Sequence, residues 1–292
     1  SQGTILRGRA VPDPRAATLH RKRVPRSVRR PSRAYGATAL SAASDYDRRS
    51  MATAADVWLV VPTYEEAENI EALVAAVRER LPASRRVLIV DDASPDGTGE
   101  IADRLARRHD DVEVLHRPGK SGIGPAYVAG FQRALAGGAR LIAQMDADFS
   151  HDPADLPRLL AAAEHADVVL GSRYVDGGGV TDWGPLRRLI SRGGSAYARL
   201  VLGVGVRDLT GGFKVYRRQV LEAIDLPSLS ALGYAFQIET TYRAHLAGFR
   251  VVEVPIVFRD RRVGQSKMSG AIVADAARKV PAMRLRELLR RR

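Results

Sequence analysis

Short apolar runs alternate with amphipathic segments along the chain from residue 57 onward. The apolar runs cover residues 57–61, 87–90, 112–115, 141–145 and 168–170. Between the first two runs, apolar residues recur at the spacing of one helix face: Ile70, Leu73, Val74, Val77 and Leu81. Further helices are expected from Thr98, over 126–136 and over 156–163. Apolar strands that alternate with helices predict an α/β fold with a mostly parallel central sheet flanked by helices.

Four of the predicted strands end at a group of turn-forming, acidic or basic residues. These groups are Pro62, Asp91-Asp92, Asp146-Ala147-Asp148 and Gly171-Ser172-Arg173. Ligands of such sheets bind beyond the carboxyl ends of the strands. We therefore expect Asp92, Asp148 and Arg173 to open onto one shared hollow.

Asp146 and Asp148 form an Asp-x-Asp pair at the end of the fourth apolar run. Two carboxylates at a strand end suit a divalent cation that carries a diphosphate, because Mg²⁺ takes few carboxylates and fills its other positions with water and phosphate oxygens. The same pair also occurs in ordinary turns. Taken alone, the pair leaves both interpretations open.

Three other segments have polar or aromatic residues that suggest a local role. Turn residues after Asp92 lead into a helix, for which Asp96 or Thr98 is the expected N-cap. The glycine-rich loop at 117–124 lacks the Walker spacing, so its glycines are interpreted as allowing close approach of a ligand or close helix packing. His116 and His151 lie near motif ends, so surface positions are expected for them, with contact to a ligand as the alternative. Core positions, or positions flanking an acceptor lipid, are expected for Tyr234 and Phe236.

The net charge of +13 is concentrated at the two ends of the sequence. Residues 1–50 carry a net charge of +9 and residues 278–292 carry +6, which leaves −2 for the segment between them. A nucleic-acid-binding domain would carry its positive face within the fold, so no nucleic-acid partner is expected. The sequence has no cysteine, which excludes disulfides and a cysteine nucleophile.

The composition predicts three parts. Residues 1–50 are rich in Arg, Pro, Ser and Ala and are expected to be a disordered basic segment, either an upstream linker or an arm that touches anionic lipid. Residues 51–270 form the predicted α/β domain, and residues 271–292 a basic amphipathic C-terminal helix interrupted at Pro281. No apolar run approaches the roughly 18 residues of a membrane span.

Five separated motifs resemble those of family 2 glycosyltransferases with the GT-A (Rossmann-like) fold, in the same order. They are Pro62-Thr63-Tyr64-Glu65-Glu66-Ala67-Glu68-Asn69-Ile70, Asp91-Asp92-Ala93-Ser94-Pro95-Asp96-Gly97-Thr98, Met145-Asp146-Ala147-Asp148, Gly171-Ser172-Arg173-Tyr174 and Gly264-Gln265-Ser266-Lys267. Within that family the chain looks like polyprenyl (dolichyl) phosphate mannose synthases, and in particular the catalytic domain of the actinobacterial polyprenyl-monophosphomannose synthases. The resemblance covers roughly residues 56–275.

The resemblance implies a role for each matching residue. The residues that would bind the guanosine part of GDP-mannose are Pro62, Tyr64, Glu66, Val90, Asp91 and Asp92. Asp146, Ala147 and Asp148 would contact the donor diphosphate, with Mg²⁺ or Mn²⁺ on Asp148, Asp146 and Ser150, where Ser150 replaces a Gln of some relatives. The basic residues that would act on the phosphates, and bind the acceptor phosphate, are Arg173, Arg261 and Lys267.

The implied reaction moves mannose from GDP-mannose to a polyprenyl monophosphate. The phosphate nucleophile is already largely ionised at pH 7, so no strong general base is required. Direct displacement would invert the anomeric carbon and give polyprenyl phosphate β-mannose. The alternatives are transfer from a UDP-sugar on the same fold and a sugar-nucleotide-binding regulator without catalysis. The regulator would need a broken metal motif, whereas Asp146-Ala147-Asp148 is intact.

Residues 183–202 mix apolar and basic residues and suit an amphipathic helix at a membrane interface. A helix packed in the core with an exposed basic face is the alternative, and residues 271–292 present the same two options. We expect peripheral association with the cytoplasmic face of the membrane, where a membrane-embedded partner protein or domain could assist binding.

Overall fold

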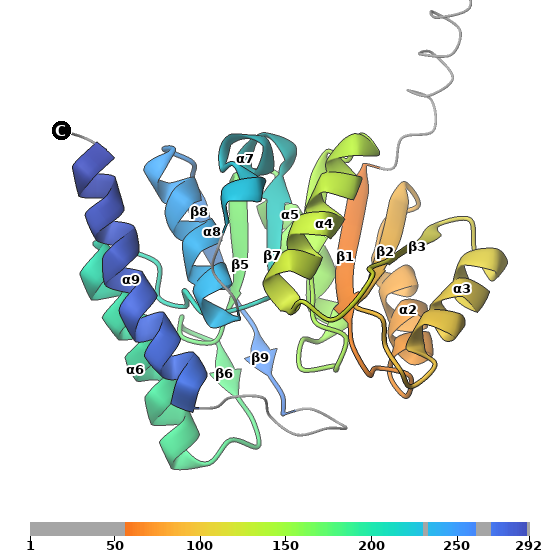
Figure 1. Ribbon diagram of the computed structural model, residues 1–292, viewed down its shortest axis with the longest axis horizontal. Coiled ribbons are helices and arrows are strands. Elements are labelled where there is room, and N and C mark those ends of the chain that lie inside the picture. The colour runs from red at the N-terminus through yellow and green to blue at the C-terminus, as the bar shows by residue number, and fades with distance from the viewer. Residues whose placement is uncertain (1–55, 230–232, 261–269, 291–292) are drawn as a thin grey trace, which may run out of the picture. The chain divides into compact units, whose positions relative to one another are not determined.

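A seven-stranded sheet lies at the centre of the structure, a computed structural model that describes residues 56–229, 233–260 and 270–290 (Figure 1). The strand order is β3-β2-β1-β4-β7-β5-β8. The bounds are β1 (Val57–Thr63), β2 (Arg85–Asp91), β3 (Val112–His116), β4 (Leu141–Gln144), β5 (Val168–Ser172), β7 (Lys214–Arg217) and β8 (Val251–Pro255). All neighbours pair in parallel except β7, which is antiparallel to β4 and β5. The predicted, mostly parallel sheet is confirmed.

All five predicted strands are present, with small differences at their ends. β1 and β2 continue past their apolar residues, because the parallel pairing extends to Thr63 opposite Asp91. β4 ends at Gln144, one residue earlier than expected. Each extension carries a polar side chain to the carboxyl edge of the sheet.

Helices cover both faces of the sheet. One face packs against α2 (Ile70–Arg80), α3 (Thr98–Arg108) and α5 (Leu156–Ala162). The other face packs against α4 (Ile123–Ala136), α7 (Arg218–Ala223) and α8 (Tyr234–Leu246). Successive side chains of β1 point to opposite faces of the sheet. Leu59 packs in the core on the side of α2, and Val60 packs in the core on the side of α4.

Two longer helices, α6 (Pro185–Leu202) and α9 (Gly270–Arg290), pack together beside α8 (Figure 1). Two short strands, β6 (Gly179–Val180) and β9 (Val257–Phe258), pair in parallel near them. The remaining elements are the 3₁₀ turns η1 (Pro153–Asp155) and η2 (Leu226–Ser228). Residues 1–50 lie outside the described residues.

Two local expectations are wrong. The N-cap of α3 is Gly97, in a left-handed conformation, although the carboxylate of Asp96 does accept the N–H of Thr98 at 3.1 Å. Pro281 does not interrupt the C-terminal helix, because α9 runs through it. Val280 and Met283 on either side of the proline are buried, so tertiary packing holds the helix together there.

Lys214 lies fully buried at the start of β7. Its Nζ donates to the backbone carbonyl of Gln237 at 2.8 Å and to Thr241 Oγ1 at 3.0 Å. Burial lowers the pKa of Lys214 to about 7, because an uncompensated charge is costly away from water.

Replacing Lys214 with Met removes the amine and keeps a side chain of similar size. Between its lowered pKa of about 7 and the ordinary value of 10.5, the unfolded chain holds the Lys214 proton while the folded chain releases it. The wild type should therefore gain stability relative to Lys214→Met as the pH rises, by about 1 kcal/mol per pH unit. Denaturant unfolding across this window measures the difference. A constant or falling difference would contradict a buried amine of lowered pKa.

Candidate active site

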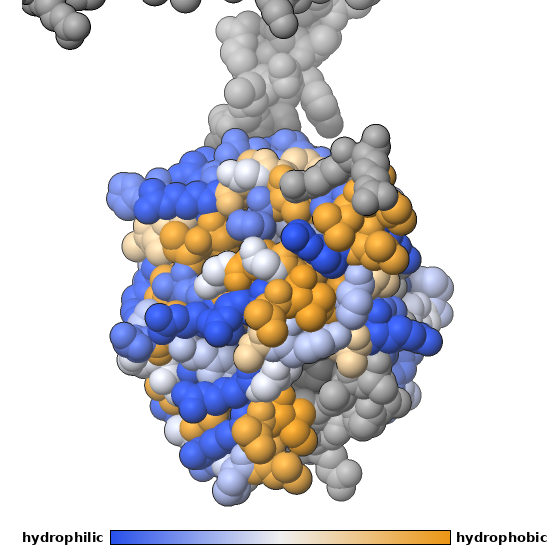
Figure 2. Space-filling view, turned by 90° about the vertical axis from the view of Figure 1, so that its left-hand side faces the viewer, coloured by the Kyte–Doolittle hydropathy of each residue, from blue (hydrophilic) through white to orange (hydrophobic). Residues whose placement is uncertain are grey.

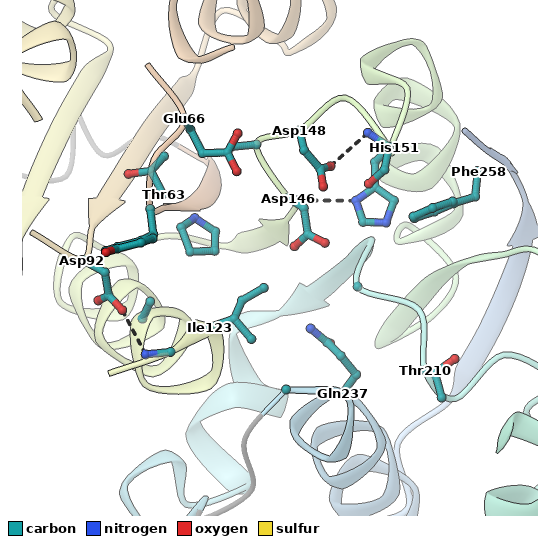
Figure 3. Close-up of a pocket in the computed structure, with 18 of the residues that line it drawn as sticks. Thr63, Glu66, Asp92, Ile123, Asp146, Asp148, His151, Thr210, Gln237 and Phe258 are labelled. Carbon is teal, nitrogen blue, oxygen red and sulfur yellow. Dashed lines mark hydrogen bonds between the residues drawn. The ribbon is translucent and has the colours of Figure 1, made fainter. Parts of the chain in front are cut away.

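A cavity of about 370 Å³ lies beyond the carboxyl ends of β1 and β4 (Figure 3). These two strands are neighbours in the sheet, and the strand order reverses between them, which is where ligands of open α/β sheets bind. Asp92, Asp148 and Arg173 all line this cavity. The shared hollow expected from the sequence is therefore present.

The structure brings most of the predicted site residues together in this cavity. Those that line it are Pro62, Tyr64, Glu66, Asp92, Asp146, Ala147, Asp148, Ser150 and Arg173. Val90 and Asp91 do not line it: Val90 is buried in the core, and Asp91 accepts hydrogen bonds from Thr63 and Ser94. Arg261 and Lys267 lie outside the described residues.

The carboxylate of Asp92 holds the loop after β3 at one end of the cavity. Its Oδ2 accepts hydrogen bonds from the backbone N–H groups of Ser121 and Gly122, each at 3.0 Å, and Oδ1 pairs with Arg117. Lys120 of the same loop lies 3.6 Å from the centre of the Tyr64 ring. An aromatic ring and a cation therefore lie at this end, where a nucleotide base and its phosphates could bind. Sequence reasoning missed Lys120, although it lies in the glycine-rich loop.

Three residues at the carboxyl edge adopt a left-handed backbone that non-glycine residues rarely use. They are Glu65, Ala93 and Phe149, with φ of 59°, 56° and 59°. Each follows the end of β1, β2 or β4, and the conformation costs about 1–2 kcal/mol per residue. Such strain is concentrated at ligand sites. At Phe149 it turns the chain between Asp148 and Ser150, which both line the cavity.

The Asp-x-Asp pair and Ser150 place three oxygen-bearing side chains on one wall. Asp146 Oδ1 accepts a hydrogen bond from Tyr127 at 2.9 Å, and Asp148 Oδ1 accepts one from the backbone of Ser150 at 3.1 Å. Burial, together with the charge of Asp146, raises the pKa of Tyr127 well above its ordinary value, so Tyr127 stays a donor.

Asp146, Asp148 and Ser150 fit a divalent cation that takes most of its coordinating atoms from water and from a bound phosphate group. The buried hydroxyl of Ser150 has no hydrogen-bond partner among the described residues. In that same part of the chain, no group of three or more acidic, histidine or cysteine side chains could hold a metal. A site with two carboxylates and one hydroxyl leaves most positions to water and phosphate oxygens, as Mg²⁺ prefers.

His151 is buried in the cavity wall, so its expected surface position is wrong. Its Nδ1 accepts the backbone N–H of Asp146 at 3.4 Å, and its ring stacks on Phe213. Burial lowers the pKa of His151, which keeps the ring neutral. In the sequence, the one sign that His151 belongs to the cavity wall is that it lies three residues after Asp148. By contrast, the side chain of His116 is half exposed, as expected.

Arg173 is a buried cation at the other end of the cavity. Its Nε and Nη2 donate to the two carboxylate oxygens of Asp208 at 2.7 and 2.6 Å, and Nη2 also donates to Thr210. Burial opposes ionisation of Asp208, but Arg173 outweighs it and holds the pKa of that carboxyl below its ordinary value. The guanidinium is thus fixed in place by a bidentate ion pair.

The chain is similar to a protein family and, within it, to two individual proteins of known name. The family model for glycosyl transferase family 2 matches residues 58–225. An undecaprenyl-phosphate mannosyltransferase from Micrococcus luteus is 48% identical over 220 residues, covering 75% of this chain and 90% of that protein. A polyprenol monophosphomannose synthase from Mycolicibacterium smegmatis is 48% identical over 236 residues, covering 80% and 88%.

The chain belongs to glycosyl transferase family 2. It is therefore a glycosyltransferase, as its motifs predicted. Solved structures of glucosyl-3-phosphoglycerate synthase from Mycobacterium tuberculosis share its GT-A fold with a TM-score of 0.59 and 19% identity, covering 81% of each chain. One of those structures holds Mn²⁺, UDP and glucosyl-3-phosphoglycerate, and another holds Mg²⁺ and UDP.

The glycosyltransferase exposes apolar side chains on α6. Leu186 and Leu189 are each 69% exposed and Leu200 is 83% exposed. The α6 residues that pack inward are Ser195, Ala198 and Leu202. The helix therefore packs against the core through one face and exposes apolar as well as basic side chains, so features of both interpretations are present. Figure 2 shows apolar and hydrophilic side chains interleaved on this side of the molecule. None of the helices described is long and apolar enough to cross a membrane.

Removing the partner of Arg173 should destabilise this glycosyltransferase strongly. Asp208→Ala leaves a buried guanidinium without its counter-charge, and the free energy of unfolding is expected to fall by about 3–5 kcal/mol. Glu222→Ala is the matched control, because Glu222 pairs with Arg218 on the surface of α7. That change should cost less than about 1 kcal/mol. Denaturant unfolding of both variants checks the prediction, and equal losses would contradict it.

Proposed function

We propose that this glycosyltransferase transfers mannose from GDP-mannose to a polyprenyl monophosphate and forms polyprenyl phosphate β-mannose. The observation that carries the proposal is one cavity that is lined by Asp92, Asp146 and Asp148 and also by Arg173. The names of the two relatives at 48% identity support the mannosyl donor and the lipid acceptor.

The donor would lie along the acidic part of the cavity. Tyr64, Glu66 and Asp92 would surround the nucleoside, and Lys120 would face its phosphates. Mg²⁺ or Mn²⁺, held by Asp148, Asp146 and Ser150, would neutralise charge on the diphosphate leaving group. The Tyr127 hydrogen bond keeps the Asp146 carboxylate in a fixed orientation.

The acceptor phosphate would bind at the basic end. Because a phosphate monoester is largely ionised at pH 7, the site needs to position and shield its charge rather than remove a proton. Arg173 is held ready for this by Asp208 and Thr210. Arg261 and Lys267, outside the described residues, are proposed to complete the phosphate site. In-line attack on the anomeric carbon then inverts its configuration.

The apolar side chains of α6 support peripheral membrane binding next to the cavity. Trp183, just before this helix, and Arg187, in its first turn, line the cavity. Farther along, Leu189 and Leu200 are exposed, with Arg188 and Arg192 exposed among them. A helix with exposed leucines and arginines suits the interface of an anionic leaflet. We propose that α6 lies on the cytoplasmic face of the membrane and delivers the lipid phosphate to Arg173.

The test of the reaction is transfer of labelled sugar to polyprenyl phosphate. The wild type should use GDP-mannose in preference to UDP-glucose, and chelation of divalent cations should stop the transfer. Asp148→Ala should lower turnover by about 100-fold or more, because charge on the leaving group is no longer neutralised. Gln132→Ala, on the exposed surface of α4, is the control. A preference for UDP-glucose, or full activity of Asp148→Ala, would disprove the donor or the metal site.

The membrane site predicts a loss of vesicle binding when the apolar side chains of α6 are made acidic. Leu189→Glu with Leu200→Glu should weaken cosedimentation with phosphatidylglycerol vesicles by about tenfold or more, through lost burial and added repulsion. The control is Gln132→Glu, which adds a negative charge on α4. Unchanged binding of the α6 double variant would exclude this face. Binding only in native membranes would instead indicate a membrane-embedded partner.

A further inference from the structure

The amide of Gln237 lies in the cavity wall without a role in the steps described above. Gln237 belongs to α8, is 4% exposed and lines the cavity together with Asp146 and Thr210. Figure 3 shows its side chain pointing into the space below Asp146, between the Asp92 end and the end with Thr210 and Phe258. It therefore lies between the proposed nucleoside site and the proposed acceptor site.

Hydrogen bonds to the protein core fix which end of this amide faces the cavity. Gln144 donates to the backbone carbonyl of Gly212 at 2.7 Å, so the atom involved must be its nitrogen, since a carbonyl only accepts. The same nitrogen donates to Gln237 Oε1 at 2.8 Å. The hydroxyl of Tyr216 lies 3.1 Å from Gln144 Oε1, a distance at which it can donate in that orientation.

Because Gln237 Oε1 accepts from Gln144, the other end of the amide, Nε2, is turned toward the cavity. This nitrogen makes no hydrogen bond to another residue in the described ranges. The backbone of Gln237 is held as well, because its carbonyl accepts from Lys214. A neutral hydrogen-bond donor is thus presented to a ligand by a rigid support, so little side-chain entropy is lost on binding.

No side chain of residue 212 separates this donor from Asp146, because residue 212 is glycine. A Cβ atom on Gly212 would lie 3.6 Å from Gln237 Nε2, 3.5 Å from Asp146 Oδ2 and 3.5 Å from His151 Cε1. A donor and a carboxylate acceptor therefore border the same small volume. A hydroxyl group suits such a place, because it can donate to one neighbour and accept from the other.

We infer that this volume receives the transferred hexose and that Gln237 Nε2 donates to one of its hydroxyl groups. This inference rests on the proposed function, since it names the part of the donor that Gln237 contacts. A neutral amide is suited to a neutral hydroxyl, whereas the phosphates have Arg173 and Lys120 within the described part of the cavity. Gln237 is then a determinant of sugar specificity, held in position by Gln144 and Tyr216.

The first test compares binding of GDP-mannose with binding of GDP by calorimetry in the presence of Mg²⁺. Gln237→Met removes the Nε2 donor, together with the Oε1 that accepts from Gln144, and keeps the length of the side chain. It should weaken GDP-mannose binding by about tenfold, as expected for one lost hydrogen bond, and leave GDP binding unchanged. Gln219→Met, on the exposed face of α7, is the control and should change neither.

Deoxy analogues of the donor identify the contact without any variant. For the wild type, one mono-deoxy GDP-mannose should bind about tenfold more weakly than GDP-mannose. For Gln237→Met, the same deoxygenation should cost nothing further. Equal weakening of GDP and GDP-mannose would indicate a merely structural role. A change confined to the KM for polyprenyl phosphate would place the amide on the acceptor, and either result overturns the inference.

Gly212→Ala tests the volume itself. All three neighbours of the added methyl group would lie at ordinary contact distances, so the fold should tolerate it. The methyl group would occupy the space meant for the sugar, so GDP-mannose binding should fall by about tenfold or more while GDP binding is retained. Gly205→Ala, where no atom lies within 4 Å, is the control. Unchanged GDP-mannose binding by Gly212→Ala would refute the hexose site.

These binding measurements do not depend on turnover. If the wild type binds GDP-mannose but transfers no mannose to polyprenyl phosphate, the proposed function fails and the hexose site is still tested. If UDP-glucose binds in its place, the same comparisons with UDP-glucose and UDP decide whether Gln237 contacts the sugar.

Discussion

The parallel pairing of β1 with both β2 and β4 is the constraint on which the site depends. It brings Thr63, Asp91 and Gln144 to one edge of the sheet, although they are far apart in the chain. The turns that follow these strands then carry Asp92 and Asp148 over the same edge. β1 and β2 end side by side, with Thr63 opposite Asp91, and β4 ends beside them at Gln144, opposite Val60. The strained turns that follow lie at the same edge, and a cavity forms where the strand order reverses.

Behind that edge, the sheet carries polar side chains where an ordinary core would be apolar. Lys214, Tyr216 and Gln144 are all fully buried, and their hydrogen bonds run from β4 and β7 to α8. Such a network is costly unless every member is satisfied. Its effect here is to fix the wall of the cavity, and it ends at the amide of Gln237.

Asp92 and Arg173, at opposite ends of the cavity, each have their own partner of opposite charge. Asp92 is neutralised by Arg117 and by the loop at 119–122, while Arg173 is balanced by Asp208. The carboxylates and the guanidinium can therefore lie in one cavity without collapsing onto each other. This separation matches a reaction between two anionic substrates, in which the protein must hold a sugar diphosphate and a phosphate side by side. The exposed apolar side chains of α6 follow Arg187, a residue of the same helix that lines the cavity.

The sequence alone was enough to predict the α/β fold, the five strands from β1 to β5 and the acidic residues at their ends, because apolar periodicity and strand-end turns are local signals. It could not show that Asp91 turns away to Thr63 and Ser94 while Asp92 stays in the cavity, since adjacent residues on a strand differ only in the side they face. The buried place of His151 and the role of Gln237 were also out of reach. Gln237 is oriented by Gln144, which lies 93 residues earlier in the chain, and the ring of His151 is buried against Phe213, just before β7. Only the tertiary structure shows these positions, because the donor and acceptor ends of a side chain are assigned only when its hydrogen-bond partners are in place.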